Sequence, residues 1–235
     1  MAHVDKYTHT AAVNLIRHME RTIANPANKD IDRTRSHRNY KLSPERKCFE
    51  KSGTKLFAKG QSDYDYYKSR KSQVYCYGRS DLKTIAGWVI PMPRDLPPEQ
   101  HKAFFQETYN FLERRYRAEN VVNACVHLDE SGVTGHLHFL FMPIAPDKKH
   151  GGEKICANAV LTRRELRVFH TELAKHLKSA GINANILNGA TAGGNRSVSE
   201  LKHDREIERI SELEREIARL KEILREPERE KKGVF

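Results

Sequence analysis

The sequence contains no long apolar run. None of its hydrophobic stretches approaches the roughly 18 to 20 consecutive apolar residues that a membrane-spanning helix requires. Residues 1–21 carry charges and histidines where a secretory signal peptide would have its apolar core. We therefore expect a protein that has neither a membrane span nor an export signal and that works in the cytoplasm.

Cysteine is also scarce. The chain has four cysteines, which lie far apart and form no Cys-x-x-Cys pair: Cys48, Cys76, Cys125 and Cys156. This usage does not favour a disulfide framework and indicates reduced thiols in a cytosolic protein.

Acidic residues are in the minority. The chain has 42 Lys and Arg against 31 Asp and Glu, which gives a formal net charge of +11. Residues 199–235 are nearly balanced, with ten basic and eleven acidic side chains, so the positive excess belongs to residues 1–198. Such an excess favours a polyanionic partner, with nucleic acid first and an anionic membrane surface second.

Hydrophobic periodicity predicts an α+β fold, in which helices lie on one or both faces of an antiparallel sheet. The expected strands are residues 2–9, 84–92, 121–128, 136–143 and 155–161. The expected helices are residues 10–25, residues 99–118 and a segment between a Thr162 capping box and Gly181.

Composition divides the chain into three parts. Residues 1–187 form the predicted globular domain, residues 188–200 a linker, and residues 201–235 an amphipathic helix. Apolar residues of that helix recur at spacings of three and four: Ile210, Leu213, Ile217, Leu220 and Leu224. This two-heptad seam is compatible with a short coiled coil that forms a homodimer and equally with a helix that docks on its own domain.

Three histidines are expected to converge at one hairpin. His127 ends one apolar run, and His136 and His138 lie two apart in the next, so both point to the same face of a strand. A single strand histidine is usually a satisfied core or surface residue, but burying three imidazoles without partners would be costly. The pattern predicts a site for a divalent cation with open coordination positions, with Asp129 or Glu130 as a base or supporting group.

Basic residues gather in residues 27–42, which have little periodicity. Four cations and an amide side chain there suit phosphates and exposed base edges: Lys29, Arg33, Arg35, Arg38 and Asn39. Tyr40 could stack on an unpaired base, and an ordinary basic loop is the competing interpretation.

Two further patterns are ambiguous by themselves. His18 and Arg21 share one face of the first helix, which also describes a solvated polar face. Aromatic and basic residues alternate in residues 41–84, which suits a channel for single-stranded nucleic acid or the packed and solvated sides of short helices.

Three segments together resemble a known family. Residues 28–40 (NKDIDRTRSHRNY), the His-x-x-Arg at His18 and Arg21, and VHLDES from Val126 with GHLH from Gly135 resemble the three motifs of MobV-class plasmid mobilisation relaxases. These Mob/Pre proteins belong to the HUH endonucleases, whose signature is a His-hydrophobic-His pair. The resemblance covers roughly residues 10–180.

The resemblance implies a five-stranded antiparallel sheet with flanking helices, the HUH relaxase or Rep-like fold, and an Mn²⁺ or Mg²⁺ site. It also implies cleavage of one strand at a plasmid origin of transfer, in single-stranded or hairpin form, with the protein left joined to the 5′ phosphate. A conjugative coupling protein is an implied partner.

Roles follow from the matched positions. His127, His136 and His138 match the metal triad, and Glu130 matches an acid that assists the nucleophile. His18 matches a nucleophile that gives a phosphoramidate adduct, and Tyr40 matches the alternative nucleophile of tyrosine-using relatives. The DNA-contacting positions of the family match Arg21, Arg35 and Asn39.

This chain departs from the family at the hairpin tip, where SGVTG from Ser131 to Gly135 is two residues longer than the usual Ser-Thr-Pro. The segment after the domain is also short for a mobilisation relaxase. Two alternatives to a relaxase remain open: a replication initiator or transposase of the same HUH chemistry, and a DNA-binding repressor with a structural metal.

Overall fold

The computed structural model describes residues 2–24, 28–52, 55–130, 134–187 and 198–232. They belong to two compact units, residues 1–188 and residues 189–235. None of the helices in these ranges is long and apolar enough to cross a membrane.

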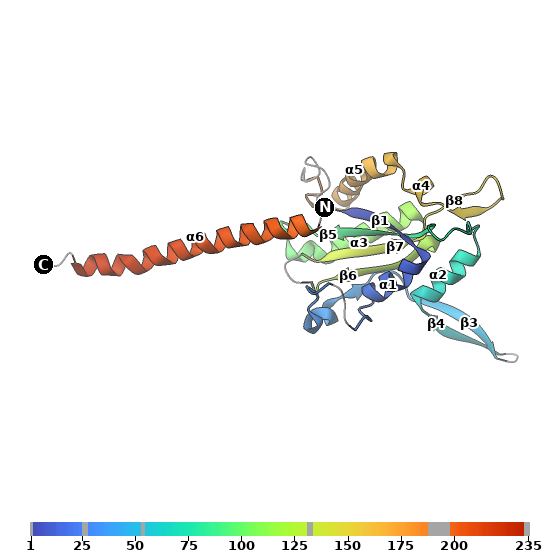
Figure 1. Ribbon diagram of the computed structural model, residues 1–235, viewed down its shortest axis with the longest axis horizontal. Coiled ribbons are helices and arrows are strands. Elements are labelled where there is room, and N and C mark those ends of the chain that lie inside the picture. Colours follow the sequence, from blue (N-terminus) through green and yellow to red (C-terminus); the bar gives the residue numbers. More distant parts are fainter. Residues whose placement is uncertain (1, 25–27, 53–54, 131–133, 188–197, 233–235) are drawn as a thin grey trace. The chain divides into compact units, whose positions relative to one another are not determined.

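A five-stranded sheet forms the centre of the first unit (Figure 1). Every neighbouring pair is antiparallel, and the strand order is β1-β5-β7-β6-β2. The strands are β1 (His3–Thr8), β2 (Tyr40–Lys41), β5 (Lys83–Pro91), β6 (Val121–His127) and β7 (His136–Phe141). The predicted α+β fold with an antiparallel sheet of about five strands is confirmed.

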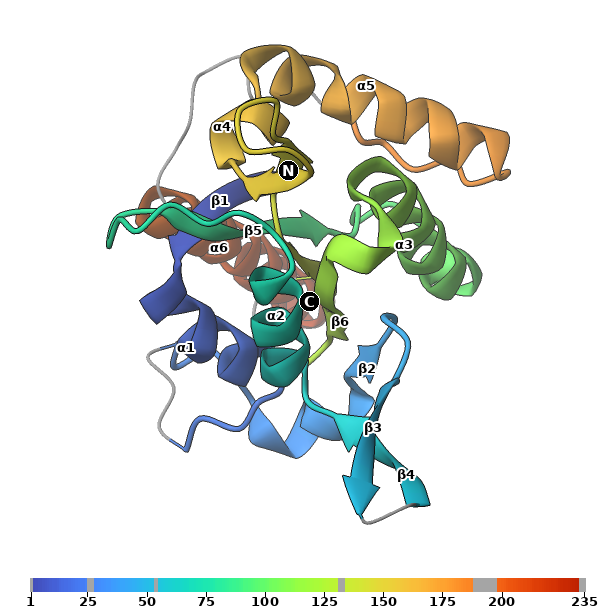
Figure 2. The ribbon, with the colours of Figure 1, turned by 90° about the vertical axis from the view of Figure 1, so that its right-hand side faces the viewer.

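Helices cover both faces of this sheet (Figures 1 and 2). On one face lie α3 (His101–Tyr116) and α5 (Arg163–Ser179), and on the other lie α1 (His9–Met19) and α2 (Asp63–Ser72). Side chains alternate along a strand, so Leu137, Phe139 and Phe141 of β7 enter the α3/α5 core, whereas His136 and His138 point to the α1/α2 face.

Aromatic packing holds the α3/α5 side together. The ring of Trp88 on β5 stacks on Phe169 of α5, with centroids 3.6 Å apart and planes inclined by 10°. The indole N–H donates to Tyr116 Oη at 3.0 Å, so the buried polar atom of the tryptophan is satisfied. This core fixes the strands that carry the histidines.

Smaller elements surround the sheet. Two ribbons, β3 (Arg46–Ser52) with β4 (Lys55–Gln61) and β8 (Ile144–Pro146) with β9 (Glu153–Ile155), each have two antiparallel strands. The short helices are η1 (Arg33–Arg38), η2 (Pro98–Gln100), η3 (Ala118–Asn120) and α4 (Ala157–Val160). Residues 41–84 therefore contain a β-ribbon besides the short helix α2, which the sequence pattern did not predict.

Two predicted elements need correction. The strand expected at residues 155–161 is wrong, because β9 ends at Ile155 and a helical turn begins at Ala157. The helix expected at residues 10–25 ends at Met19, and Arg21 has a φ of 56° that a helix cannot contain. Its buried residues are Ala12, Ile16 and Met19.

The second unit contains α6 (Val198–Lys232). Most of the predicted linker, residues 188–197, lies outside the described residues, and its last three residues already belong to the helix. The seam residues Ile210, Leu213, Ile217 and Leu220 are each about half exposed. The predicted coiled coil stays a prediction.

Candidate active site

The three hairpin histidines come together on the α1/α2 face of the sheet. His127 lies opposite His136 across the β6/β7 pair, and His138 follows two residues along β7. Ring centroids are 4.7 Å apart for His127 and His138, 4.8 Å for His136 and His138, and 5.6 Å for His127 and His136. The convergence predicted from the two apolar runs is thus present, although residues 131–133 of the connecting loop lie outside the described residues.

A fourth histidine reaches the cluster from α1. The ring of His18 lies 5.7 Å from that of His138 and 5.9 Å from that of His127, between centroids. His18 occupies the last turn of α1, and burial of Ile16 and Met19 holds this turn against the sheet. The His18 side chain is therefore part of the site, which rules out the solvated polar face considered above.

The end of α1 also fixes the tautomer of His127. Nε2 of His127 donates to the carbonyl oxygen of Met19 at 3.0 Å, so its Nδ1 is the unprotonated nitrogen. Among the described residues, Nδ1 of His127 and Nε2 of His138 are buried ring nitrogens without a hydrogen-bond partner. Two buried ring nitrogens without partners are costly in an apolar interior unless something binds them.

Burial keeps these imidazoles neutral. It lowers the pKa of His127 to about 3, and the charge on Arg21 adds to this effect. The pKa of His138 is likewise far below its ordinary value, because the ring is buried and because His127 and His136 are its neighbours. Neutral imidazoles are the form that binds metal.

The donor atoms fit a divalent cation. His18, His127, Glu130 and His138 each offer one atom, and these four atoms lie within 4.8 Å of one another. The donors are nitrogen and oxygen, which suit a borderline or hard divalent cation. His136 is outside this set of four, with its Nε2 3.7 Å from Glu130 Oε1, and its assignment as a ligand stays a prediction.

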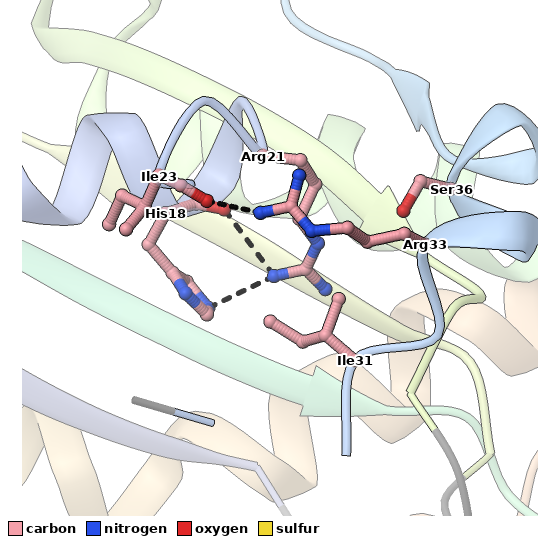
Figure 3. Close-up of a pocket in the computed structure, with 6 residues that line it drawn as sticks. All are labelled: His18, Arg21, Ile23, Ile31, Arg33 and Ser36. Carbon is pink, nitrogen blue, oxygen red and sulfur yellow. Dashed lines mark hydrogen bonds between the residues drawn. The ribbon is translucent and has the colours of Figure 1, made fainter. Parts of the chain in front are cut away.

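Arg21 connects the two acids to His18. Its Nε and Nη2 donate to the two carboxylate oxygens of Asp129 at 2.9 and 2.6 Å, and Nη2 also donates to Glu130 Oε1 at 2.9 Å. Nη1 donates to His18 Nε2 at 3.3 Å, so this ring nitrogen is unprotonated (Figure 3). A left-handed φ is uncommon for a residue with a long side chain, and here it turns the guanidinium back toward the histidines.

Asp129 is the anchor of this arrangement. Its side chain is fully buried and also accepts from Ser36 Oγ at 2.6 Å. Burial by itself would raise the pKa of Asp129, but the hydrogen bonds from Arg21 and Ser36 and the charge on Arg21 outweigh it and hold the pKa well below the ordinary range. Asp129 is therefore an ionised supporting group, which is one of the two roles that the sequence left open for it.

The basic loop is built against the hairpin. Arg35 Nη2 donates to the carbonyl oxygen of Leu128 at 2.7 Å, and Asn39 Oδ1 accepts from the Leu128 N–H, also at 2.7 Å. Arg33 bonds the carbonyl oxygens of Ile23 and Ala24. These predicted DNA contacts therefore already hold the loop in place, whereas Lys29 and Arg38 are exposed.

A small pocket opens between α1 and this loop. It is lined by His18, Arg21, Ile23, Ile31, Arg33 and Ser36, and Figure 3 shows the His18 and Arg21 side chains side by side in it. The ring nitrogen that Arg21 contacts is thus reached from a pocket with two arginines in its wall.

Tyr40 lies elsewhere. It pairs with Val126 on the edge strand β2, and its half-buried ring packs against the α3/α5 core. Burial raises its pKa. Because His127 is the next residue after Val126 and points to the other face, the sheet separates Tyr40 from the histidines.

Part of the site had no signal in the sequence. The carbonyl of Met19 acts only because α1 ends there, and a backbone group leaves no mark in residue patterns. Ser36 was one of several polar residues in the loop, and nothing distinguished it as the partner of Asp129.

The fold and the site together define an α+β domain with a histidine cluster on one face of its antiparallel sheet, as expected from the three motifs. The family model described as plasmid recombination enzyme (Mob/Pre) matches residues 1–185, so the chain belongs to this family. A plasmid recombination enzyme of Lactiplantibacillus plantarum is 29% identical over 86% of this chain and 54% of its own length. A type 3 plasmid recombination enzyme of Staphylococcus aureus is 27% identical over 83% of this chain and 43% of its own. The chain spans about half the length of these curated relatives.

Solved structures share the fold. The MobM relaxase domain, in a Mn-bound crystal structure with plasmid pMV158 oriT DNA, matches with a TM-score of 0.66 at 24% identity. The match covers 87% of this chain and 97% of that domain. A second Mn-bound crystal structure of the same domain with oriT DNA gives a TM-score of 0.65.

Proposed function

We propose that this chain is a relaxase that nicks one DNA strand at a plasmid origin of transfer and stays joined to the 5′ phosphate, in the bacterial cytoplasm, for conjugative mobilisation. Its family and the fold it shares with a relaxase domain bound to oriT DNA support the proposal. The observation that carries it is the unprotonated Nε2 of His18 beside the unpaired ring nitrogens of His127 and His138.

His18 is the proposed nucleophile. Burial and the neighbouring Arg21 lower its pKa, which keeps the imidazole neutral near pH 7. In the proposed step, Nε2 forms a bond to phosphorus and the bond from phosphorus to the 3′ oxygen breaks. The 3′ oxygen takes up a proton and the ring loses its Nδ1 proton, so the product is a neutral-ring phosphoramidate.

Mn²⁺ or Mg²⁺ is the proposed cofactor. When bound, it would polarise the nonbridging oxygens of the scissile phosphate, which favours the charge that develops there. His127 and His138 would hold it through their unpaired nitrogens, and His136 is the predicted third ligand. Glu130, held by Arg21, offers an oxygen within 4.8 Å of the donor atoms of the histidines in this set, and it can ligate the cation or orient His18.

Binding of the DNA strand is assigned to the basic loop. Lys29 and Arg38 are exposed and available for phosphates. Arg33, Arg35 and Asn39 bond the backbone of the loop and of the hairpin, so they fix its shape and can present their remaining donors to DNA. A homodimer through α6 and a conjugative coupling protein are further proposed partners.

The experiment incubates the protein with single-stranded oligonucleotides that tile the neighbouring plasmid DNA, in Mn²⁺ or in EDTA. Denaturing gels then display labelled DNA and protein together. The proposal predicts a Mn²⁺-dependent cut with one product shifted to the mass of the protein, which the His138→Ala variant does not give.

The alternatives predict different results. A cut at a replication origin or at the end of a mobile element would replace the relaxase with an initiator or transposase. Tight binding to duplex DNA without cleavage, equal in wild type and His138→Ala, would replace it with a DNA-binding repressor.

A further inference from the structure

Three exposed rings meet at the end of the sheet where β5 begins. His150 stacks on Tyr75, with centroids 3.9 Å apart and planes inclined by 17°, and Tyr77 meets Tyr75 edge-on at 5.0 Å. Tyr75 and Tyr77 are 39% and 37% exposed, so both residues keep surface that a ligand can contact. We call Tyr75, Tyr77 and His150 the aromatic platform.

The platform is held rigidly from below. The N–H of Tyr75 donates to the carbonyl of Glu153 at 2.8 Å, and the carbonyl of Tyr75 accepts from Ile155 at 3.1 Å, so this segment runs beside β9. The buried carboxylate of Asp147 bonds Nδ1 of His150 at 2.7 Å and Nζ of Lys154 at 3.3 Å. Preformed rings lose little conformational entropy when they bind a flat partner.

Cations flank the platform. A cavity of about 470 Å³ beside Tyr77 is lined by Lys6, Arg79 and Lys83, with Asp81 as its acidic residue. Lys6 bonds Asn158 at 2.9 Å, and Arg79 pairs with Asp81 at 3.2 Å on an exposed surface, where such a pair exchanges partners readily. Lys148 and Lys149 are exposed in the same loop as His150.

This surface is distinct from the histidine site. Lys83 begins β5, whereas Val89, six residues further along the same strand, is the residue that pairs with His138. At about 3.4 Å per residue the two places are roughly 20 Å apart along the strand. Figure 1 shows β8 and α4 at the end of the sheet where β5 begins, and Figure 2 views the unit from that end.

We propose that the aromatic platform and the cavity beside it form a second binding site for single-stranded DNA, in which an unpaired base stacks on Tyr77 and the adjoining phosphates meet Arg79 and Lys83. Exposed rings combined with fixed cations are what sequence-tolerant single-strand binding uses. The proposal deepens the proposed function and rests on it for DNA as the partner. It gives the strand a contact beyond the few nucleotides that the histidine site can hold.

The test measures binding of an oligothymidylate of about 20 nucleotides by fluorescence anisotropy in EDTA, so that cleavage plays no part. Tyr77→Ala is compared with Tyr77→Phe, which keeps the ring. Lys83→Ala is compared with Lys175→Ala, which removes the same charge from an exposed position on α5. Among the described residues the Tyr77 side chain makes no hydrogen bond, so we expect its loss to leave the fold intact.

We expect Tyr77→Ala to raise the Kd about tenfold, because one stacked base contributes an effect of that order, while Tyr77→Phe binds like the wild type. Lys83→Ala should lower the slope of log Kd against log salt by about 0.7, the value for one phosphate contact on a single strand, and Lys175→Ala should leave it unchanged. Equal Kd values for Tyr77→Ala and Tyr77→Phe, or no binding by the wild type, would overturn the proposal.

A nicking assay distinguishes a failure of this second-site proposal from a failure of the proposed function. The variants should still nick an oligonucleotide that ends close to the scissile phosphate, because such a strand does not reach the platform. If no oligonucleotide is ever nicked, the relaxase proposal fails, while the anisotropy comparison still decides the second site.

Discussion

At the scale of single residues, the site depends on groups that have no partner of their own. Nε2–H of His127 donates to the Met19 carbonyl, which leaves Nδ1 without a partner, and Nε2 of His138 is also unpaired. A cation is the partner that satisfies two neutral imidazoles at once. The same contact with Met19 ties the hairpin histidines to the helix that carries His18.

Metal affinity should therefore depend on each hairpin histidine. We expect His127→Ala, His136→Ala and His138→Ala each to weaken Mn²⁺ binding by at least about tenfold in isothermal titration calorimetry. His170→Ala is the matched control, because His170 is half-buried and bonds the backbone of Ala2, away from the cluster. Unchanged affinity in the three variants would show that the cluster does not hold the metal.

Arg21 is expected to be irreplaceable by lysine. Its fork reaches both oxygens of Asp129, Glu130 and His18 at the same time, and an ammonium group cannot make this set of contacts. We expect Arg21→Lys to slow nicking by about tenfold or more, and to lower the free energy of unfolding by about 1 to 3 kcal/mol because a buried carboxylate loses donors.

The control for this variant is Arg17→Lys, which changes an exposed arginine on α1, the helix that precedes Arg21. Stopped-flow nicking rates and urea denaturation measure the two effects. Wild-type rates in Arg21→Lys would mean that a single positive charge is sufficient at this position.

At the scale of elements, sequence patterns succeeded where a buried face imposes a period. The alternating residues of β7, the run of β5 and the Thr162 capping box were predicted, and Thr162 Oγ1 does accept from the Glu165 N–H at 3.1 Å. These patterns failed where the structure of a segment depends on a partner far along the chain. β9 exists because Ile155 pairs with Ile144, and neither residue signals this by itself.

The helix α5 shows both outcomes. Leu166, Phe169, Leu173 and Leu177 recur at helical spacing, which predicts one buried stripe. The last three are fully buried, whereas Leu166 is 40% exposed. Periodicity locates the stripe but not where along it the packing begins.

This difference gives a stability prediction. We expect Leu173→Ala to lower the free energy of unfolding by about 2 to 5 kcal/mol, as is usual for a buried leucine. Leu166→Ala, the same substitution two turns earlier on the same helix, should cost less than about 1 kcal/mol. Urea denaturation monitored by the fluorescence of Trp88, which stacks on Phe169, measures both; equal losses would contradict the packing described for α5.

The candidate site could be predicted from the sequence only as far as the strands and helices that carry its residues could be. The histidine hairpin follows from two apolar runs, whereas the placement of His18 required knowing that α1 ends at Met19 and lies on the histidine face. The separation of Tyr40 from His18 depends on strand pairing. Because Tyr40 pairs with Val126, its side chain lies on the same face of the sheet as that of Val126.

At the scale of the whole molecule, the first unit holds the apolar core and the candidate site, and the described part of the second unit is a charged helix. We expect a chain that stops at Asn188 to unfold cooperatively in circular dichroism and to bind Mn²⁺ like the full chain. The predicted homodimer through α6 should be lost in this truncation, as measured by sedimentation velocity. A full chain that is monomeric would contradict the coiled coil, and a truncated chain that does not fold would contradict the division into units.

The central claim is that His18, and not Tyr40, attacks the scissile phosphate. The direct measurement is the yield of covalent protein–DNA adduct, from Mn²⁺-dependent reactions of an oligonucleotide that carries the nick site, resolved on denaturing gels. We predict that His18→Ala gives no adduct and that Tyr40→Phe gives it at the wild-type level, because the sheet separates Tyr40 from the histidine cluster. An adduct that persists in His18→Ala and disappears in Tyr40→Phe would contradict the account.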